Sequence, residues 1–148
     1  MKVMFDTSAL IPAMIKAHPQ HKKSHTCLKM ALNNEIDYLV SSHSIAECYS
    51  VLTSLPISPK ITPNSANHLI EYNIKKSAKI INITSTDYFH VLTTLVNLEL
   101  YGGIIYDALI LRAAEKSNSS VLLTYNIKDF NKLLPSTDLE IKSPDQFL

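Results

Sequence analysis

Three acidic residues stand in stretches of sequence that are otherwise apolar. Asp6 follows the apolar run at 3–5, whereas Glu47 and Asp107 each interrupt an apolar run with the character of a helix. An unpaired carboxylate is costly to remove from water, so three of them in such surroundings indicate a shared positive partner. Mg²⁺ fits this role because it prefers hard oxygen ligands. A bound Mg²⁺ ion activates water and offsets charge on phosphate oxygens, so the pattern predicts hydrolysis of phosphodiester bonds.

Each acid also has a simpler structural interpretation. Asp6 and Asp107 lie where helices are predicted to begin, and an acid at that position often caps the helix or interacts with its dipole. Glu47 could point from its helix into solvent. We favour a joint site because all three acids are expected at one edge of a sheet, where α/β folds bind their ligands. Asn126 or Asp129, which follow the apolar run at 121–124, would supply a fourth oxygen ligand there.

The apolar runs alternate between strand-like and helix-like segments. Short runs rich in β-branched residues predict strands, and longer segments with apolar residues three and four apart predict helices. Strands separated by helical crossovers form parallel sheets that are covered on both faces. We therefore expect an α/β fold with strands at 2–6, 38–41, 79–83, 121–124 and 139–141, and helices at 8–16, 20–32, 44–53, 63–77, about 86–100, from before 107 to 117, and 129–133.

Particular residues are expected to mark the ends of the helix at about 86–100. Ser85 or Thr86 is a suitable N-cap, because a hydroxyl can accept a hydrogen bond from the first turn. Gly102 and Gly103 are the only glycines in the chain. We expect them to end this helix and to provide the turn into the helix that carries Asp107.

Length and composition predict one compact domain that remains in the cytoplasm. The chain has 148 residues, and a hydrophobic content of 46% is sufficient for a substantial core. No apolar run approaches the roughly 18 residues of a membrane span, and the first residues do not resemble a cleavable leader. Cys27 and Cys48 are far apart, so we expect free buried thiols and no disulfide.

The formal net charge of +1 does not support a strongly basic nucleic-acid binder. Binding to a polyanion would require a local patch, and a basic cluster does follow the first predicted helix. A solvated helix face is the alternative interpretation. The three histidines of the cluster have spacings that could form a transition-metal site, but no Cys or carboxylate completes it, so we favour a solvated or RNA-facing helix. The cluster comprises Lys16, His18, His21, Lys22, Lys23, His25 and Lys29.

Four short motifs occur in order along most of the chain. They are Phe5-Asp6-Thr7-Ser8-Ala9-Leu10, then Ser44-Ile45-Ala46-Glu47, then Gly102-Gly103 with Tyr106-Asp107-Ala108-Leu109-Ile110, then Leu123 to Phe130. In this order the chain resembles a PIN domain of the VapC toxin type. The resemblance implies a single PIN domain over 1–148, with a parallel β-sheet in an α/β/α three-layer sandwich. It also implies an endoribonuclease that cleaves RNA with Mg²⁺ or Mn²⁺ through a metal-activated water.

The resemblance implies roles for particular residues. Asp6 and Asp107 would hold the metal, and Glu47 would support it or help to activate water. Ser8 and Thr124 would orient carboxylates or phosphate by hydrogen bonds. The family often has an acid at the fourth acidic position, where this chain has the neutral Asn126, with Asp129 close by as a substitute ligand. Because of this departure, the number of bound metal ions, one or two, stays open. Independently of the resemblance, the basic cluster makes Lys22 and Lys23 candidates for contact with RNA.

The resemblance also implies partners. Family members form homodimers and are silenced by a small antitoxin protein, and we expect such a partner to place an Arg or Lys among the three acids. Its apolar helix would lie in a groove formed by residues such as Ile11, Met14, Ile15 and Val51. The alternative is a degenerate PIN-like domain that binds RNA or a protein without cleavage. A purely structural module, which would bind no divalent ion, is a third possibility.

Overall fold

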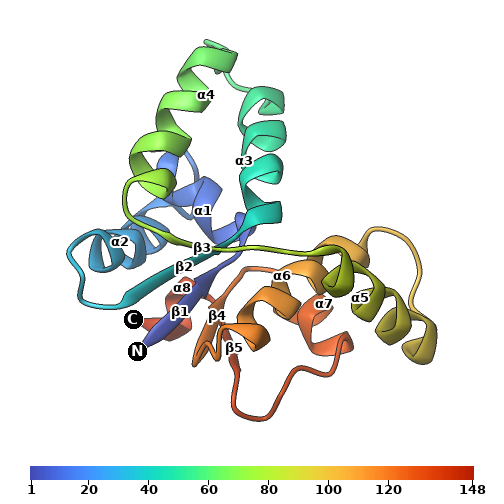
Figure 1. The fold of residues 1–148 in the computed structure, drawn as a ribbon. Coiled ribbons are helices and arrows are strands. Elements are labelled where there is room, and N and C mark those ends of the chain that lie inside the picture. The colour runs from blue at the N-terminus through green and yellow to red at the C-terminus, as the bar shows by residue number, and fades with distance from the viewer.

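A five-stranded parallel sheet forms the centre of the molecule in the computed structural model, which describes residues 1–148 (Figure 1). The strand order is β3-β2-β1-β4-β5, and every neighbouring pair is parallel. The first strand therefore lies at the centre, and the chain moves outward on both sides of it. The strands are β1 (Lys2–Phe5), β2 (Asp37–Ser41), β3 (Lys79–Ile81), β4 (Val121–Leu123) and β5 (Glu140–Lys142).

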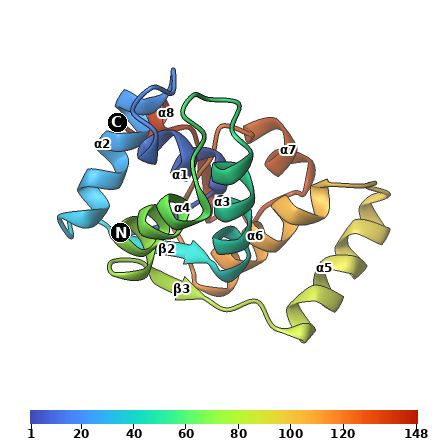
Figure 2. The same cartoon turned by 90° about the horizontal axis from the view of Figure 1, so that it is seen from above.

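Helices cover both faces of the sheet, as the sequence predicts. One face carries α1 (Thr7–Met14), α2 (His21–Leu32), α3 (Ser42–Ser54), α4 (Pro63–Ile70), the π-helix η1 (Glu71–Lys75) and α8 (Pro144–Phe147). The other carries α5 (Ser85–Leu98), α6 (Ile104–Lys116) and α7 (Ile127–Lys132). Helix α5 packs on α6 and stands at the side of the molecule (Figure 2). None of the helices is both long and apolar enough to cross a lipid bilayer.

The central strand shows how the two cores are divided. Val3 and Phe5 are buried in the core under α1 to α4, whereas Met4, between them, is buried in the core under α6. This alternation follows from the pleat of a strand, in which successive side chains point to opposite faces. The result is the predicted three-layer α/β/α arrangement.

Two features of α5 differ from the sequence prediction. Its N-cap is Thr84 rather than Ser85 or Thr86, because Asp87 lies three residues after Thr84 and completes a reciprocal capping box. The helix also ends at Leu98, before the glycines, with Glu99 in the left-handed region at φ 52°. Gly102, at φ 71°, serves the turn into α6.

Two other segments also differ. The predicted helix at 63–77 ends as an α-helix at Ile70 and continues as η1, where the Asn73 side chain donates to the main-chain oxygen of Leu69 at 2.9 Å. A side chain that takes this carbonyl competes with the regular helical hydrogen bond, which explains the wider turn. The short α8 is not predicted from the sequence; Ser143 and Gln146 form its capping box.

The buried Asp87 links α5 to α6. Its carboxylate accepts hydrogen bonds from Lys116 Nζ at 2.6 Å and Arg112 Nε at 3.0 Å, and it also accepts one from the Thr84 amide. Burial alone would raise the pKa of Asp87, but these hydrogen bonds outweigh it and hold the pKa below its usual range. The carboxylate thus ties the first turn of α5 to α6, and Val91 and Leu95 pack the rest of the helix into the core.

We expect Asp87→Ala to lower the free energy of unfolding by about 2–4 kcal/mol, because it leaves two cations without their partner and removes a cap. Chemical denaturation measures the change. Glu71→Ala is the matched control, since Glu71 forms an exposed ion pair with Lys75 at 3.1 Å and its loss should cost less than about 0.5 kcal/mol. Equal losses in the two variants would contradict this role of Asp87.

Candidate active site

Asp6 lies where the central strand turns into the first helix. It is 2% exposed and caps α1 by accepting a hydrogen bond from the Ser8 amide. The same oxygen, Oδ2, accepts hydrogen bonds from Ser8 Oγ at 2.6 Å and from Thr124 Oγ1 at 2.8 Å. The other oxygen, Oδ1, accepts none. Both the capping interpretation and the orienting contacts expected of Ser8 and Thr124 are therefore found, and the carboxylate is held with one oxygen free.

The two hydroxyls also fix the loop after β4. Ser8 Oγ accepts a hydrogen bond from the Tyr125 amide, and Thr124 Oγ1 accepts one from the Asn126 amide, both at 2.9 Å. Residues more than a hundred positions apart meet here because β1 and β4 are adjacent and in register, with Phe5 opposite Leu123. Asn126 is therefore placed at the level of Asp6, as the sequence predicts.

Glu47 is held on α3 by contacts that the sequence analysis did not identify. Thr7 Oγ1 donates to Glu47 Oε2 at 3.2 Å, and His43 Nε2 lies 3.5 Å from the same oxygen without the geometry of a hydrogen bond. The His43 ring stacks on Tyr106, with centroids 5.3 Å apart and an interplanar angle of 1°. In the sequence, only the spacing of four residues between His43 and Glu47 points to these contacts. The stack of His43 on Tyr106 joins two helices that are distant in sequence, so no local pattern predicts it.

A cavity of about 390 Å³ brings together the three predicted acids, Asp6, Glu47 and Asp107, and the predicted ligand Asn126. We call this cavity the acidic cleft. Ser8 and Tyr125 also line it, as do apolar residues of α1 and α3. The structure thus places the three acids at the carboxyl edge of the sheet in one cleft.

Asp129 does not line the acidic cleft. It lines a neighbouring cavity of about 530 Å³ together with Asp107, Glu99 and Lys132. Its Oδ1 accepts a hydrogen bond from Lys132 Nζ at 3.0 Å. Asp107 borders both cavities, so Asn126 and Asp129 approach it from different sides.

Burial raises the pKa of all three acids of the cleft, and neighbouring acids add to the effect at Asp107 and Glu47. Burial, followed by the charges of Asp6, Asp129 and Glu47, raises the pKa of Asp107 to about 7. Burial also raises the pKa of Asp6, despite its hydrogen bonds, and that of Glu47, where the charge of Asp6 adds to the effect and His43 opposes it. No lysine or arginine forms an ion pair with Asp6, Glu47 or Asp107. The cleft therefore concentrates negative charge without an internal cation.

The donor set of the cleft fits a hard divalent cation. Carboxylate and amide oxygens are the ligands that Mg²⁺ prefers, and a positive ion would favour the charged form of Asp107, whose pKa is raised by burial and then by the neighbouring acids. As the side chains lie, no three His, Cys, Asp or Glu residues are grouped closely enough to form a ready-made metal site. Mg²⁺ usually keeps several water ligands, so its binding does not require three direct protein ligands.

Most of the basic cluster lies on α2, beside the cleft, whereas Lys16 and His18 precede that helix. Lys22 and Lys23 are exposed and do not line the cleft, whereas His18 and Gln20, which precede α2, do. The Tyr125 hydroxyl is within hydrogen-bonding distance of the buried Ser24 hydroxyl, at 3.1 Å, and this contact ties α2 to the loop after β4. The sequence offered no signal for this contact.

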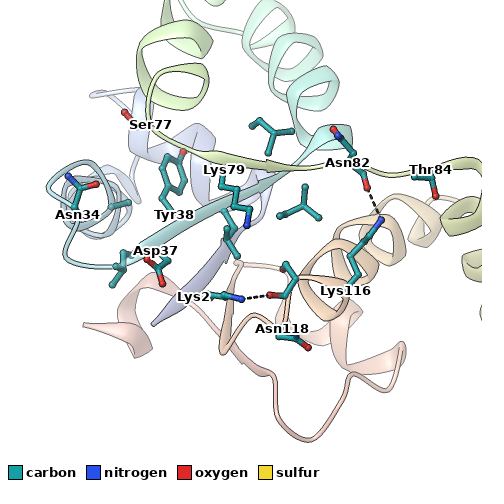
Figure 3. A pocket seen from close by; sticks show the side chains of 16 residues that line it. Lys2, Asn34, Asp37, Tyr38, Ser77, Lys79, Asn82, Thr84, Lys116 and Asn118 are labelled. Carbon is teal, nitrogen blue, oxygen red and sulfur yellow. Dashed lines mark hydrogen bonds between the residues drawn. The ribbon is translucent and has the colours of Figure 1, made fainter.

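A larger cavity, of about 770 Å³, lies elsewhere (Figure 3). It is lined by residues of β2 and β3 and by the start of β1, and Lys2, Lys79 and Lys116 extend along it. Lys2 donates to the main-chain oxygen of Ser117 and Lys116 to that of Asn82, each at 3.0 Å. None of the acids of the cleft lines this cavity, so size alone does not indicate the site of chemistry.

Residues 3–133 match the family model of the PIN domain, and the chain therefore belongs to the PIN domain family. Ribonuclease VapC27 of Mycobacterium tuberculosis is 29% identical over 116 residues, which cover 78% of this chain and 79% of that protein.

Two solved structures share the fold. Mycobacterium tuberculosis VapC20, described as a sarcin-ricin loop cleaving toxin, superposes with a TM-score of 0.67 at 12% identity, covering 86% of this chain and 92% of that one. VapBC2 from Rickettsia felis, bound to a DNA fragment from its promoter, gives a TM-score of 0.66 at 23% identity, covering 97% and 98%. These likenesses confirm the predicted fold class.

The raised pKa of Asp107 predicts how stability depends on pH when EDTA removes divalent ions. The folded state holds a proton on Asp107 up to about pH 7, whereas the ordinary value is 3.8, so the free energy of unfolding should rise as the pH falls between these values. We expect Asp107→Asn to be more stable than the wild type at about pH 8, by about 1 kcal/mol after allowance for partial exposure. Denaturation at several pH values tests this, with the exposed Asp138→Asn as control. Parallel pH profiles for Asp107→Asn and the wild type would contradict it.

Proposed function

We propose that this protein is a Mg²⁺- or Mn²⁺-dependent endoribonuclease and the toxin of a toxin-antitoxin pair. The observation that carries the proposal is the acidic cleft, in which Asp6, Glu47 and Asp107 share a cavity without a neutralising cation. Membership of the PIN domain family and the similarity to a protein named ribonuclease VapC27 support it.

The side chains of the cleft suit hydrolysis of a phosphodiester. Asp6 and Asp107 would hold the ion, with Asp6 presenting its free Oδ1. A bound Mg²⁺ would activate a water molecule and offset charge on the phosphate. Glu47 Oε2 is occupied by Thr7, so Oε1 remains to accept a proton, and a raised pKa makes Glu47 a better base. Asn126 offers an oxygen without charge, so we propose one well-held ion; two equally tight Mg²⁺ sites in calorimetry would contradict this.

We expect Asp6→Asn, Glu47→Gln and Asp107→Asn each to lower RNA cleavage by on the order of 10²-fold or more, because each removes charge that acts on the transition state. The fold should remain intact, as the substitutions preserve side-chain shape. Cleavage of a labelled RNA by purified proteins measures the loss, and Asp138→Asn should leave the rate unchanged.

EDTA should abolish wild-type cleavage, and Mn²⁺ or Mg²⁺ should restore it. An Asp107→Asn protein with the wild-type rate would contradict the mechanism; RNA binding without any cleavage by the wild type would favour the degenerate alternative.

We propose that the lysines of α2 hold the RNA backbone beside the cleft. Lys22 and Lys23 are exposed and form no ion pair, and helix α2 contacts α1, whose first residues line the cleft. A net charge of only +1 means that such a local patch must supply most of the attraction to a polyanion.

Replacement of Lys22 and Lys23 together by Ala should weaken RNA binding and reduce the dependence of affinity on salt, because fewer counterions are released from the RNA. Binding measured over a range of salt concentrations tests this. Lys75 and Lys76, an adjacent pair at the end of η1, provide the matched control when both are replaced by Ala. If the two double variants give the same salt dependence, the α2 lysines have no specific role in holding RNA.

We also propose that the protein forms a homodimer and is restrained by a small antitoxin. Helix α5 exposes an apolar stripe in which Phe89 is 70%, Leu92 45% and Val96 74% exposed, as suits burial against a second copy. Sedimentation as a monomer at micromolar concentration would contradict the dimer.

For the antitoxin, Ile11 and Val51 line the acidic cleft and provide an apolar wall for a partner helix. Met14 and Ile15 are partly buried against the core beside them.

An antitoxin that places an Arg or Lys in the cleft competes with the metal for the same carboxylates. Its affinity should therefore fall as Mg²⁺ is raised at constant ionic strength. The test uses the product of a small open reading frame adjacent to the gene, with Asp107→Asn as the variant in which the dependence on Mg²⁺ should weaken. An affinity independent of Mg²⁺ would mean that the partner blocks access of RNA and leaves the carboxylates untouched.

A further inference from the structure

His43 lies near the start of α3, one helical turn before Glu47. Its side chain is 15% exposed, and its Nε2 atom is buried without a hydrogen-bond partner. In the whole chain only one other buried side-chain polar atom, Ser44 Oγ on the same turn, is also unpaired. Folded proteins pair almost all of their buried polar groups, so an unpaired nitrogen beside the cleft calls for an explanation.

The carboxylate of Glu47 lies beside this nitrogen. Nε2 of His43 is 3.5 Å from Glu47 Oε2, without the geometry of a hydrogen bond. A carboxylate oxygen only accepts hydrogen bonds, so a bond between the two requires a proton on Nε2. Hydrogen bonds at catalytic sites are often long or poorly aligned before the substrate binds, and they tighten in the complex. The two atoms are therefore close enough to pair after a small movement.

The ring of Tyr106 holds the plane of the imidazole. The two rings are parallel to within 1°, with centroids 5.3 Å apart, as in the offset stacks that aromatic rings prefer. Tyr106 directly precedes Asp107 on α6. The His43 ring thus contacts the carboxylate of one acid of the cleft and the neighbour of another.

We propose that His43 is a positioning residue of the ribonuclease, whose Nε2 donates a hydrogen bond to Glu47 Oε2 and thereby leaves Oε1 free for the reaction. The inference rests on the proposed function, in which Glu47 Oε1 accepts a proton. Thr7 Oγ1 already donates to Oε2 at 3.2 Å. One donor leaves a carboxylate free to turn about that bond, whereas a second donor fixes its direction.

The arrangement at Asp6 supports this role. Its Oδ2 accepts hydrogen bonds from the hydroxyls of Ser8 and Thr124, and its Oδ1 accepts none. With His43 as the second donor to Oε2, Glu47 would be held in the same way. Each carboxylate would then have one oxygen that fixes its direction and one that remains for the chemistry.

Two substitutions separate this role from simple packing of α3 on α6. His43→Phe keeps a ring against Tyr106 but has no donor, so it should lower kcat for RNA cleavage about tenfold and leave KM unchanged. His43→Gln offers an N–H near the position of Nε2 and should recover most of the loss. His68→Phe, at an exposed position of α4, is the matched control and should cleave as the wild type does. A wild-type kcat in His43→Phe, or equal losses in His43→Phe and His43→Gln, would overturn the proposal.

Tyr106 provides a second pair of variants. Tyr106→Leu removes the ring that holds the imidazole plane and should lower kcat, whereas Tyr106→Phe keeps the ring and should not. A Tyr106→Leu protein with the wild-type kcat would overturn the contribution of the stack.

NMR of the imidazole nitrogens in the wild type, with EDTA present, provides a readout that is independent of RNA. At a mildly alkaline pH, where an imidazole is neutral, His43 should carry its proton on Nε2. A proton on Nδ1 would leave a lone pair facing Glu47 Oε2 and would overturn the proposal, even if His43→Phe failed to fold. The Tm of each variant shows whether it is folded. A wild type that cleaves no RNA would contradict the proposed function instead, and the position of the ring proton would still decide whether His43 can bind Glu47.

Discussion

The arrangement of the cleft depends on the hydrogen bonds that Ser8 and Thr124 donate to one oxygen of Asp6. These bonds join the central strand, the first helix and the end of β4, three elements that are brought together only by the parallel sheet. The same two hydroxyls accept hydrogen bonds from the amides of Tyr125 and Asn126, so this network also positions the loop after β4. Because Oδ2 of Asp6 accepts hydrogen bonds from the Ser8 amide and from both hydroxyls, the buried carboxylate is fixed in direction. Its second oxygen accepts no hydrogen bond, and Asp6 lines the cavity that Glu47 and Asp107 share.

The clustered acids of the cleft lower the stability of the fold and at the same time suit the binding of a cationic ligand. Like charges close together, in partly buried surroundings, oppose folding, as the raised pKa of Asp107 to about 7 indicates. Elsewhere the fold neutralises its buried acid, since Asp87 is bound by both Arg112 and Lys116. The contrast between the two sites is informative because the chain has cations available and uses them at Asp87. Acids left without an internal cation are expected where a ligand supplies the positive charge.

Much of this arrangement could be predicted from the sequence, because the positions of Asp6 and Asp107 follow from local patterns of apolar residues. The strands and most helices lie where those patterns place them. The cap of α5 was misplaced because the reciprocal bond between Thr84 and Asp87 decides it, and the hydroxyls at 85 and 86 are equally plausible by type. The contacts of His43 with Glu47 and Tyr106, and those of His21 and His25 with main-chain oxygens of α1, depend on packing between helices. Residue spacing alone does not contain that information.

The central claim is that the repulsion among the acids of the cleft is relieved by a divalent cation. The most direct test is to follow the side-chain carboxyl carbon of Asp107 by NMR as the pH is changed, with and without saturating Mg²⁺. Without the ion, Asp107 should titrate with a pKa of about 7. With the ion, its pKa should fall well below that value, because the cation favours the charged form. A titration curve that Mg²⁺ does not move would contradict the account.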